Sequence, residues 1–335
     1  MKFHRIQNPK EMDEEQLAAL FDTGADTVVL QFVEAAAYNK NLLQRINQAC
    51  ERFGARLNVR FYGHYGSEFD CQNLSYLPSV RSLNLDCLMK AVNLEALYEL
   101  TELEEFVFGV FEADVPRLLE DKAFFRVRRL CLSETRKKNI DLAPLSTYRY
   151  LENLFLNSHS RHIESLAGMQ SLQKLSLGGI GRSQKLDFIG SIIGLKTLTY
   201  ILGGRDNVNE LAHDGPVDLE LLRVRGLSDV NLKHFPRLER LKIEDQLQLR
   251  ELDINPVPQL QRLWIFNCKK LERLHGITEA RSLGSILIGQ TALELETIFS
   301  NIPPSVRGLS LHGPSRVAND KLQDRIKALG LVRAF

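Results

Sequence analysis

The sequence has 335 residues, of which 44% are hydrophobic and 25% are charged, a globular composition that excludes a disordered or fibrous chain. Its formal net charge of +1 at pH 7 counts against a protein that binds nucleic acid through overall charge. The charge is unevenly distributed, because residues 1–120 carry a net charge of −8 and the remaining residues carry +9. This asymmetry predicts a field that steers an oppositely charged partner, although two mixed, solvated surfaces would give the same totals.

The N-terminal 25 residues are expected to form a helical cap. Residues 11–21 (EMDEEQLAALF) have helical spacing, with acidic side chains in the first turn, where they favour the helix dipole. Residues 1–16 contain no apolar run, so we expect no secretory signal. No apolar stretch approaches the roughly 18 residues that a membrane helix requires.

The five cysteines are odd in number and include no CxxC pair or Cys/His cluster. This pattern counts against both a disulfide framework and a zinc site, and it is typical of a reducing compartment. We therefore expect a cytoplasmic protein.

Two apolar strands and a helix are expected next in the chain. Residues 26–33 (DTVVLQFV) are predicted to form the first strand, and residues 39–53 to form a helix with one apolar face. The following strand should direct Leu57, Val59 and Phe61 inward, because alternate side chains of a strand face the same side.

The hexapeptide L-x-x-L-x-L, with other apolar residues allowed at the leucine positions, recurs through the rest of the chain. Successive starts lie 19 to 24 residues apart. They fall at Val80, Leu103, Val127, Leu151, Leu172, Leu195, Leu219, Leu238, Leu260, Leu283 and Val306. One such hexapeptide is weak evidence, whereas a long series in near-constant register indicates a solenoid of stacked repeats.

This pattern resembles the leucine-rich repeats over at least residues 80–311. The resemblance implies an α/β fold, a curved horseshoe with a parallel sheet on its concave face. We expect one solenoid domain over residues 1–335, because a solenoid grows without needing a second core. It would comprise an N-terminal cap (1–25), about 11–13 repeats (26–311) and a C-terminal helical cap (312–335).

The C-terminal cap is expected to contain a helix at residues 317–330 (VANDKLQDRIKALG). Its spacing directs Leu322, Ile326 and Leu329 inward, and Gly330 is expected to end it.

The sequence departs from the family pattern at the turn after each strand, where the family often has asparagine. No asparagine occupies the matching positions here. Side chains at several of them are still expected to hydrogen-bond the turn backbone, namely Thr135, His159, Gln246, Cys268 and Thr291. We therefore expect a solenoid with an irregular spine.

No arrangement of residues indicates catalysis. The glycines at 178–181 and 203–204 follow predicted strands, so they are interpreted as turns, and the spacing of a phosphate-binding loop is absent. We expect no enzymatic activity, no cofactor and no metal site.

One cluster of outward-facing strand residues combines basic and aromatic side chains. Trp264 is the only tryptophan, and tryptophan and arginine are enriched at binding hot spots. The predicted partner-binding residues are Arg223, Arg225, Arg240, Lys242, Arg262, Trp264, Phe266 and Phe155.

A structural interpretation of the same residues remains open. Trp264 and Phe266 could pack against the arginine stems and simply cover the sheet. Glu220, Glu239 and Glu244 could pair with the basic groups and neutralise them.

The resemblance implies a non-catalytic module that grips a partner protein, with an acidic surface, on its concave face. Irregular free-standing solenoids of this kind are similar to bacterial immunity or antitoxin proteins that neutralise a cognate toxin. One alternative is an effector or ubiquitin-ligase-type substrate adaptor, because residues 302–306 (IPPSV) resemble the proline-bearing repeats of such effectors. The second alternative is nucleic-acid binding through the basic and aromatic residues, which the mixed acids disfavour. We expect no membrane and no small-molecule substrate as partners.

Overall fold

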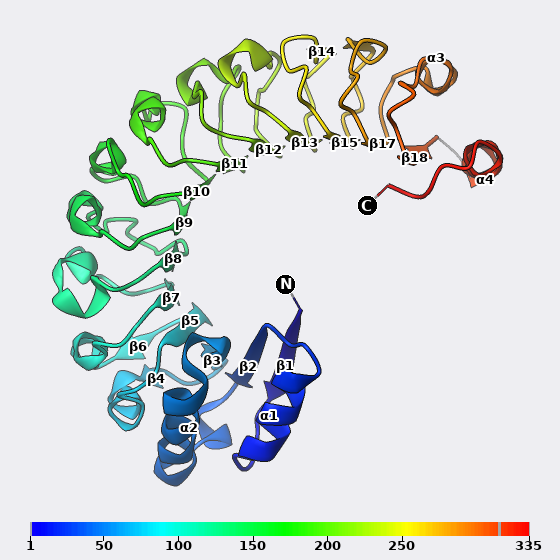
Figure 1. Ribbon diagram of the computed structural model, residues 1–335. Helices are drawn as coiled ribbons and strands as arrows, with labels where there is room; N and C mark the ends of the chain where they lie inside the picture. Colours follow the sequence, from blue (N-terminus) through cyan, green and yellow to red (C-terminus); the bar gives the residue numbers. More distant parts are fainter. Residues whose placement is uncertain (1, 314–315, 335) are drawn as a thin grey trace. The chain divides into compact units, whose positions relative to one another are not determined.

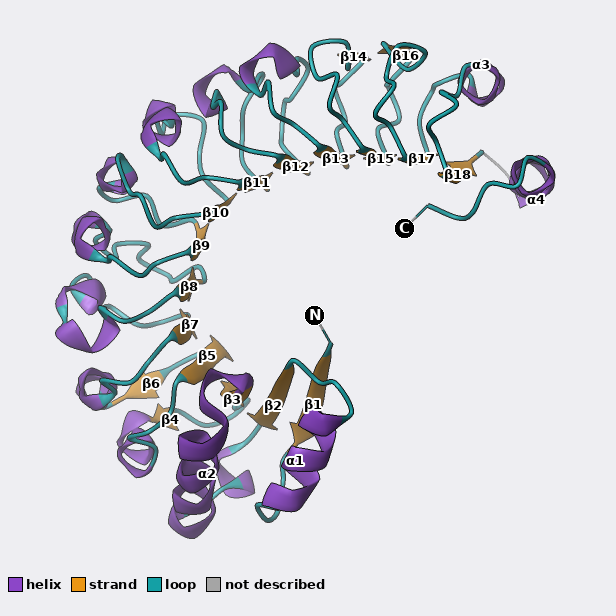
Figure 2. Ribbon diagram, viewed as in Figure 1, coloured by secondary structure: helices purple, strands orange, loops and turns teal. Residues whose placement is uncertain are grey.

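The computed structural model describes residues 2–313 and 316–334, which form two compact units, Met1–Leu166 and Ala167–Phe335. Within each unit, short parallel strands line one side and short helical turns line the other (Figures 1 and 2). The expectation of an α/β leucine-rich-repeat architecture is confirmed in both units.

The first unit contains a parallel ladder whose strands follow one another in chain order. The ladder strands are β1 (Phe3–Gln7), β2 (Thr27–Phe32), β3 (Leu57–Tyr62), β5 (Ser82–Leu88), β7 (Glu105–Val110), β8 (Arg129–Leu132) and β9 (Asn153–Asn157). The two longer helices are α1 (Glu14–Asp22) and α2 (Lys40–Phe53), and β4 (Phe69–Asp70) pairs with β6 (Ala91–Val92) in a separate small sheet. The 3-10 helices are η1 (Ala35–Ala37), η2 (Gly54–Arg56), η3 (Cys71–Tyr76), η4 (Leu94–Glu99), η5 (Leu118–Glu120), η6 (Lys122–Phe124), η7 (Ala143–Thr147) and η8 (Ile163–Leu166).

The second unit repeats this plan with a ladder that is also parallel and in chain order. Its strands are β10 (Lys174–Gly178), β11 (Thr197–Ile201), β12 (Asp218–Leu222), β13 (Arg240–Glu244), β15 (Arg262–Phe266), β17 (Ser285–Gly289) and β18 (Gly308–His312). The other side carries η9 (Asp187–Ser191), η10 (Asn209–Leu211), η11 (Leu232–His234), the short pair β14 (Glu251–Asp253) and β16 (Arg273–His275), α3 (Leu295–Ser300) and α4 (Arg316–Ala328).

The core of each unit is a stack of the repeat leucines. Leu154 is 1% exposed and Leu175 is fully buried, while Leu241 pairs with Leu263 across neighbouring strands. Because one repeat cannot bury its own apolar face, each leucine depends on the repeats beside it. The predicted inward register of these leucines is confirmed.

The N-terminal segment contains a strand that the sequence did not reveal. β1 pairs with β2 over its whole length, so residues 26–33 hold the second strand and not the first. All residues of β1 except Ile6 are exposed, and the alternation that identifies a half-buried strand is therefore missing. The expected helix at 11–21 is confirmed as α1, whose N-cap Asp13 accepts the backbone N–H of Gln16 at 2.9 Å.

The C-terminal helix is confirmed as α4, with Leu322 and Ile326 buried. The inward orientation expected for Leu329 is wrong, because α4 ends at Ala328 and Leu329 is 60% exposed. After the helix, Val332 forms a parallel bridge to the outer edge of β18. No helix within the described residues is both long and apolar enough to cross a membrane.

Four of the side chains expected to hydrogen-bond the turn backbone are fully buried, and they do so. His159 Nε2 lies 2.9 Å from the carbonyl oxygen of Ser133. Gln246 Nε2 donates to the carbonyl oxygens of Leu221 and Glu244 at 3.0 and 2.7 Å. The remaining two are Thr135, which accepts the Lys138 N–H, and Cys268, whose thiol contacts the carbonyls of Ile243 and Phe266. Thr291, which is half-buried, accepts the Leu293 N–H. These contacts supply the partners that a buried turn needs in place of the family's asparagine.

Candidate partner-binding surface

The structure brings five of the predicted binding residues together on the sheet face of the second unit. In the register of β13 against β15, Arg240 lies opposite Arg262, Lys242 opposite Trp264, and Glu244 opposite Phe266. Alternation along each strand directs these side chains away from the leucine core. Arg240, Lys242, Arg262, Trp264 and Phe266 are called the basic–aromatic cluster below.

Lys242 holds the centre of this cluster through two contacts. Its ammonium lies 4.9 Å from the centroid of the Trp264 ring, within the range of a cation–π interaction. Its Nζ also lies 3.0 Å from Glu244 Oε2 on the same strand. The lysine and the indole therefore stabilise each other's positions on the rigid strands.

Ion pairs reduce the positive charge of the cluster. Arg240 Nε lies 3.1 Å from Asp218 Oδ2, and Lys242 pairs with Glu244 as described. Both pairs are partly exposed, so they contribute little to stability, but they neutralise the charges of Arg240 and Lys242. Arg262 is exposed and forms no ion pair with any described residue.

A glycine gives the aromatic end of the cluster its shape. Gly289 separates Phe266 from His312, and the two rings meet edge-on with centroids 6.1 Å apart. A Cβ at Gly289 would lie 2.8 Å from His312 Cβ and 2.9 Å from Phe266 Cε2. Burial, and secondarily the charge of Arg333, lowers the pKa of His312, which favours a neutral ring beside Phe266.

The expected positions of Arg223 and Arg225 in this row are wrong. Glu220, and not Arg223, lies opposite Lys242 in the register of β12 against β13. Arg223 follows the end of β12 with a left-handed backbone (φ 50°), and its Nη2 lies 2.8 Å from Asp245 Oδ2. Arg225 is exposed and forms a backbone bridge to Gly204. The hexapeptide at Leu219 was therefore set three residues too late.

Phe155 lies outside the cluster, in the first unit. It occupies the middle of β9, opposite Cys131 of β8, and is half-buried.

The sequence did not reveal the partners that shape the cluster. Asp218 and Gly289 had no recognisable signal, since a strand carboxylate or glycine acts here only through its neighbours in the sheet. Of the three acids expected to neutralise the basic groups, Glu244 pairs with Lys242 as expected. Arg240 pairs instead with Asp218, which was not among the three. Among the described residues, no group of three or more His, Cys, Asp or Glu side chains is arranged to hold a metal ion.

Comparisons with known proteins identify the fold. No family model and no curated protein matches the chain. Among solved structures, the chain is similar to an internalin, InlF, from Listeria monocytogenes, with 16% identity and a TM-score of 0.54 over 94% of this chain and 87% of that one. It is also similar to the functional domain of InlJ from Listeria monocytogenes, with 14% identity and a TM-score of 0.51 over 92% of this chain and 67% of that one. These are leucine-rich-repeat structures, and the chain has the leucine-rich-repeat fold.

Proposed function

We propose that this leucine-rich-repeat chain binds a partner protein through the sheet face of its second unit, with the basic–aromatic cluster at the centre of the contact. The fold presents outward side chains of successive strands about 4.8 Å apart, which makes a continuous and rigid surface. A surface of this kind suits binding, because little side-chain freedom is lost when a partner docks.

The observation that carries this proposal is the placement of Trp264. It stands on the middle of β15 with Lys242 over its ring and Arg262 on the same strand. A large aromatic side chain beside an unpaired arginine is the composition of a binding hot spot. The half-buried ring leaves part of its apolar surface in solvent, where a partner can cover it.

The partner is proposed to present an acidic group to Arg262. Asp218 and Glu244 already neutralise Arg240 and Lys242, so the cluster as a whole is not a strong attractor of negative charge. The selective contact is therefore expected at Arg262, and the apolar contact at Trp264 and Phe266.

Toxin neutralisation in a bacterial cytoplasm is the cellular role we propose for this binding. Such a role needs only a rigid face that blocks the partner's own site, and no chemistry from the chain. The exposed thiol of Cys87 is compatible with a reducing compartment. Growth of host cells that express the captured partner, with and without this chain, tests the role directly, and unchanged growth in both would reject it.

Trp264→Ala tests the binding proposal. We expect the variant to weaken binding of the captured partner by about 2 kcal/mol or more, roughly 30-fold in Kd, because a central aromatic anchor is removed. The measurement is calorimetric titration of purified proteins after affinity capture from the native host.

The control is Ile193→Ala, which truncates an exposed apolar side chain of the second unit outside the cluster. It should leave Kd unchanged. If Trp264→Ala lowers the melting temperature but leaves Kd intact, Trp264 only covers the sheet and the proposal is wrong. Binding of oligonucleotides by the chain, with an affinity that falls steeply as the salt concentration rises, would favour nucleic acid as the partner instead.

A further inference from the structure

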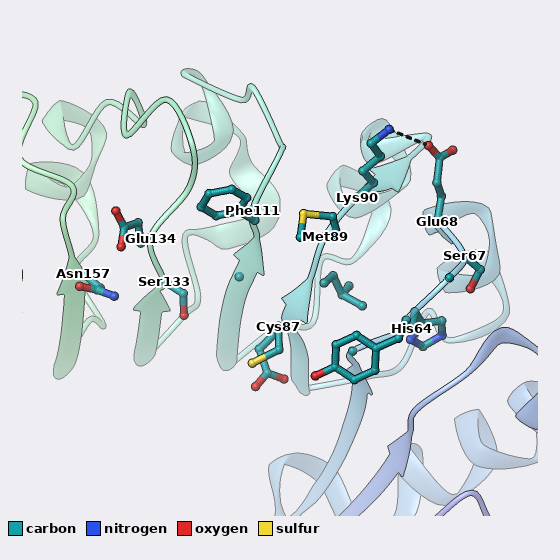
Figure 3. A pocket seen from close by; sticks show the side chains of 16 residues that line it. His64, Ser67, Glu68, Cys87, Met89, Lys90, Phe111, Ser133, Glu134 and Asn157 are labelled. Atoms are coloured by element: carbon teal, nitrogen blue, oxygen red, sulfur yellow. Dashed lines mark ion pairs between the residues drawn. The ribbon is translucent and has the colours of Figure 1, made fainter.

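The first unit contains a groove that the basic–aromatic cluster does not include. Its volume is about 700 Å³, and it lies where β3, β5, β7 and β8 end (Figure 3). The loop after β3, residues 63–68, forms one wall, and the residues that follow β5 and β7 form another.

Three backbone features lie at this groove. The register of β5 against β7 shifts between Leu85 and Leu88, so the ladder is interrupted there. Cys87 lies in the interruption with a left-handed backbone (φ 55°), a conformation that costs energy for a residue other than glycine. Gly109 also lines the groove, and because a Cβ there would lie only 3.2 Å from Asp86 Cα and from the Ser133 side chain, glycine allows these neighbours to come close. Bulges of this kind are frequent beside functional sites because they redirect side chains.

The walls of the groove carry large apolar side chains that remain in solvent. Tyr65 is 81% exposed, Met89 57% and Phe111 42%. Met89 and Phe111 lie at neighbouring strand ends (Figure 3). The backbone holds them firmly, since Phe111 N–H donates to the Leu88 carbonyl at 2.8 Å. Contiguous exposed apolar groups in a concave site mark a place where another apolar surface docks.

The polar groups of the groove are predominantly acidic. Glu68, Asp86 and Glu134 line it, but Asp86 is paired with Arg60 and Glu134 with Lys138. Lys90 Nζ lies 3.7 Å from Glu68 Oε1 and 3.6 Å from Glu112 Oε2, so its charge is shared between two carboxylates. Residues 1–120 as a whole carry a net charge of −8, whereas Arg136, Lys137 and Lys138 follow Glu134 in the chain. The surplus negative charge therefore lies at Glu68 and Glu112, which share Lys90, and it complements one positively charged group of an occupant.

We propose that this groove binds an extended protein segment in which a large apolar side chain stands next to lysine or arginine. The apolar side chain would lie between Met89 and Phe111, and the basic group would reach Glu68, which shares Lys90 with Glu112. Methionine suits such a role, because its unbranched thioether adapts to side chains of different shape. The groove is thus a second docking site, with the opposite charge preference to the one proposed for Arg262, and it stands independently of that proposal.

The test uses peptides selected from a random 12-residue phage library on the full-length protein, with binding measured by fluorescence anisotropy of the synthesised peptides. We expect the selected sequences to share a large apolar residue beside lysine or arginine. Met89→Ser and Phe111→Ser should each raise the Kd for these peptides by at least about tenfold. Tyr150→Ser is the matched control, since Tyr150 is 62% exposed in the same unit but does not line the groove.

The exposed thiol of Cys87 supplies a second readout, because it lies in the groove. A Cys131→Ser background removes the half-buried thiol, and the remaining three cysteines are buried. A bound peptide should slow alkylation of Cys87 by iodoacetamide, measured by mass spectrometry. Selection of no peptides or of acidic ones would overturn the proposal. Peptides that bind both serine variants with unchanged affinity would also overturn it. So would a dimer of the chain that dissociates when either serine substitution is made. Trp264→Ala should leave peptide binding unchanged, so failure here is distinguishable from failure of the proposed function.

Discussion

His159 illustrates how a single side chain satisfies a buried turn of this solenoid. It is fully buried, and its Nε2 donates to the Ser133 carbonyl oxygen, while Nδ1 has no hydrogen-bond partner among the described residues. Burial lowers the pKa of the ring, although the Ser133 contact opposes the shift. Protonation would place a charge and an unpaired N–H in the core, so the folded protein holds His159 neutral.

This environment predicts that the first unit loses stability as the pH falls below about 6.5, the usual histidine pKa. Below that pH the unfolded chain takes up a proton that folded His159 resists. The free energy of unfolding therefore falls until the pH reaches the lowered pKa of the folded state, and it levels off below that pKa. Urea unfolding at pH 5 to 7.5 should show this decrease in the free energy of unfolding with falling pH. Carboxylates with lowered pKa values, such as Asp141, act only at lower pH, below the usual value of 3.8.

His159→Gln should reduce the slope of the free energy of unfolding against pH, because glutamine keeps an N–H donor and cannot be protonated. Gln246 already makes the equivalent contact in the second unit. Part of the slope should remain, because burial also lowers the pKa of His64. His4→Gln is the control, since His4 is exposed. An unaltered slope in His159→Gln would show that His159 is not the titrating group.

At the scale of elements, the strand register decides which side chains meet. The segment 219–224 (LELLRV) contains leucine at 219, 221 and 222, so it fits two registers equally well. The structure selects the one in which Leu219 pairs with both Leu198 and Leu241. This choice depends on the neighbouring strands, and it makes the repeats on either side more equal in length. A one-sequence pattern cannot choose between two leucine phases, which is why Arg223 was misplaced.

Gly289 is the element-scale determinant of the aromatic end of the cluster, and its replacement is informative. Gly289→Ala adds a methyl group within 3.0 Å of His312 Cβ and of the Phe266 ring, so the ring must move and the backbone at His312 must shift. We expect a loss of about 1–3 kcal/mol from this overpacking, only partly offset by the lower entropy of the unfolded chain. The emission of Trp264, the only tryptophan, should shift as Phe266 is displaced.

Gly181→Ala provides the matched control, because no atom lies within 4 Å of its Cβ position. It should be neutral or slightly stabilising in thermal unfolding. Equal melting temperatures for Gly289→Ala and Gly181→Ala would contradict the close packing of Phe266 against His312.

Across the whole molecule, the periodic features were predictable and the interruptions were not. The leucine spacing predicted the fold, the core and the pairing of Lys242 with Trp264, because those follow from one repeated geometry. It could not predict the groove of the first unit, which depends on a ladder irregularity at Cys87 and on the close approach of neighbouring residues that Gly109 allows. Sequence reasoning noted the acidic balance of residues 1–120 but had no means of linking it to Met89 and Phe111. The partner-binding role of the cluster remains a prediction.

The charge distribution of the second unit leads to a last prediction about association rates. Arg262 is exposed and unpaired among the described residues, whereas Arg223 is held by Asp245, whose pKa is lowered by a hydrogen bond from Asn267 and by Arg223 itself. An unpaired charge at a binding surface accelerates encounter with an acidic partner, and a paired one adds little. Arg262→Gln should therefore slow association with the captured partner several-fold at low ionic strength, as measured by stopped-flow fluorescence of Trp264. Arg223→Gln should leave the rate nearly unchanged. At about 0.5 M salt the difference should vanish, because the screening length falls to roughly 4 Å. Equal rates for the two variants at low salt would mean that the partner's acidic surface, if it has one, lies against another part of the chain.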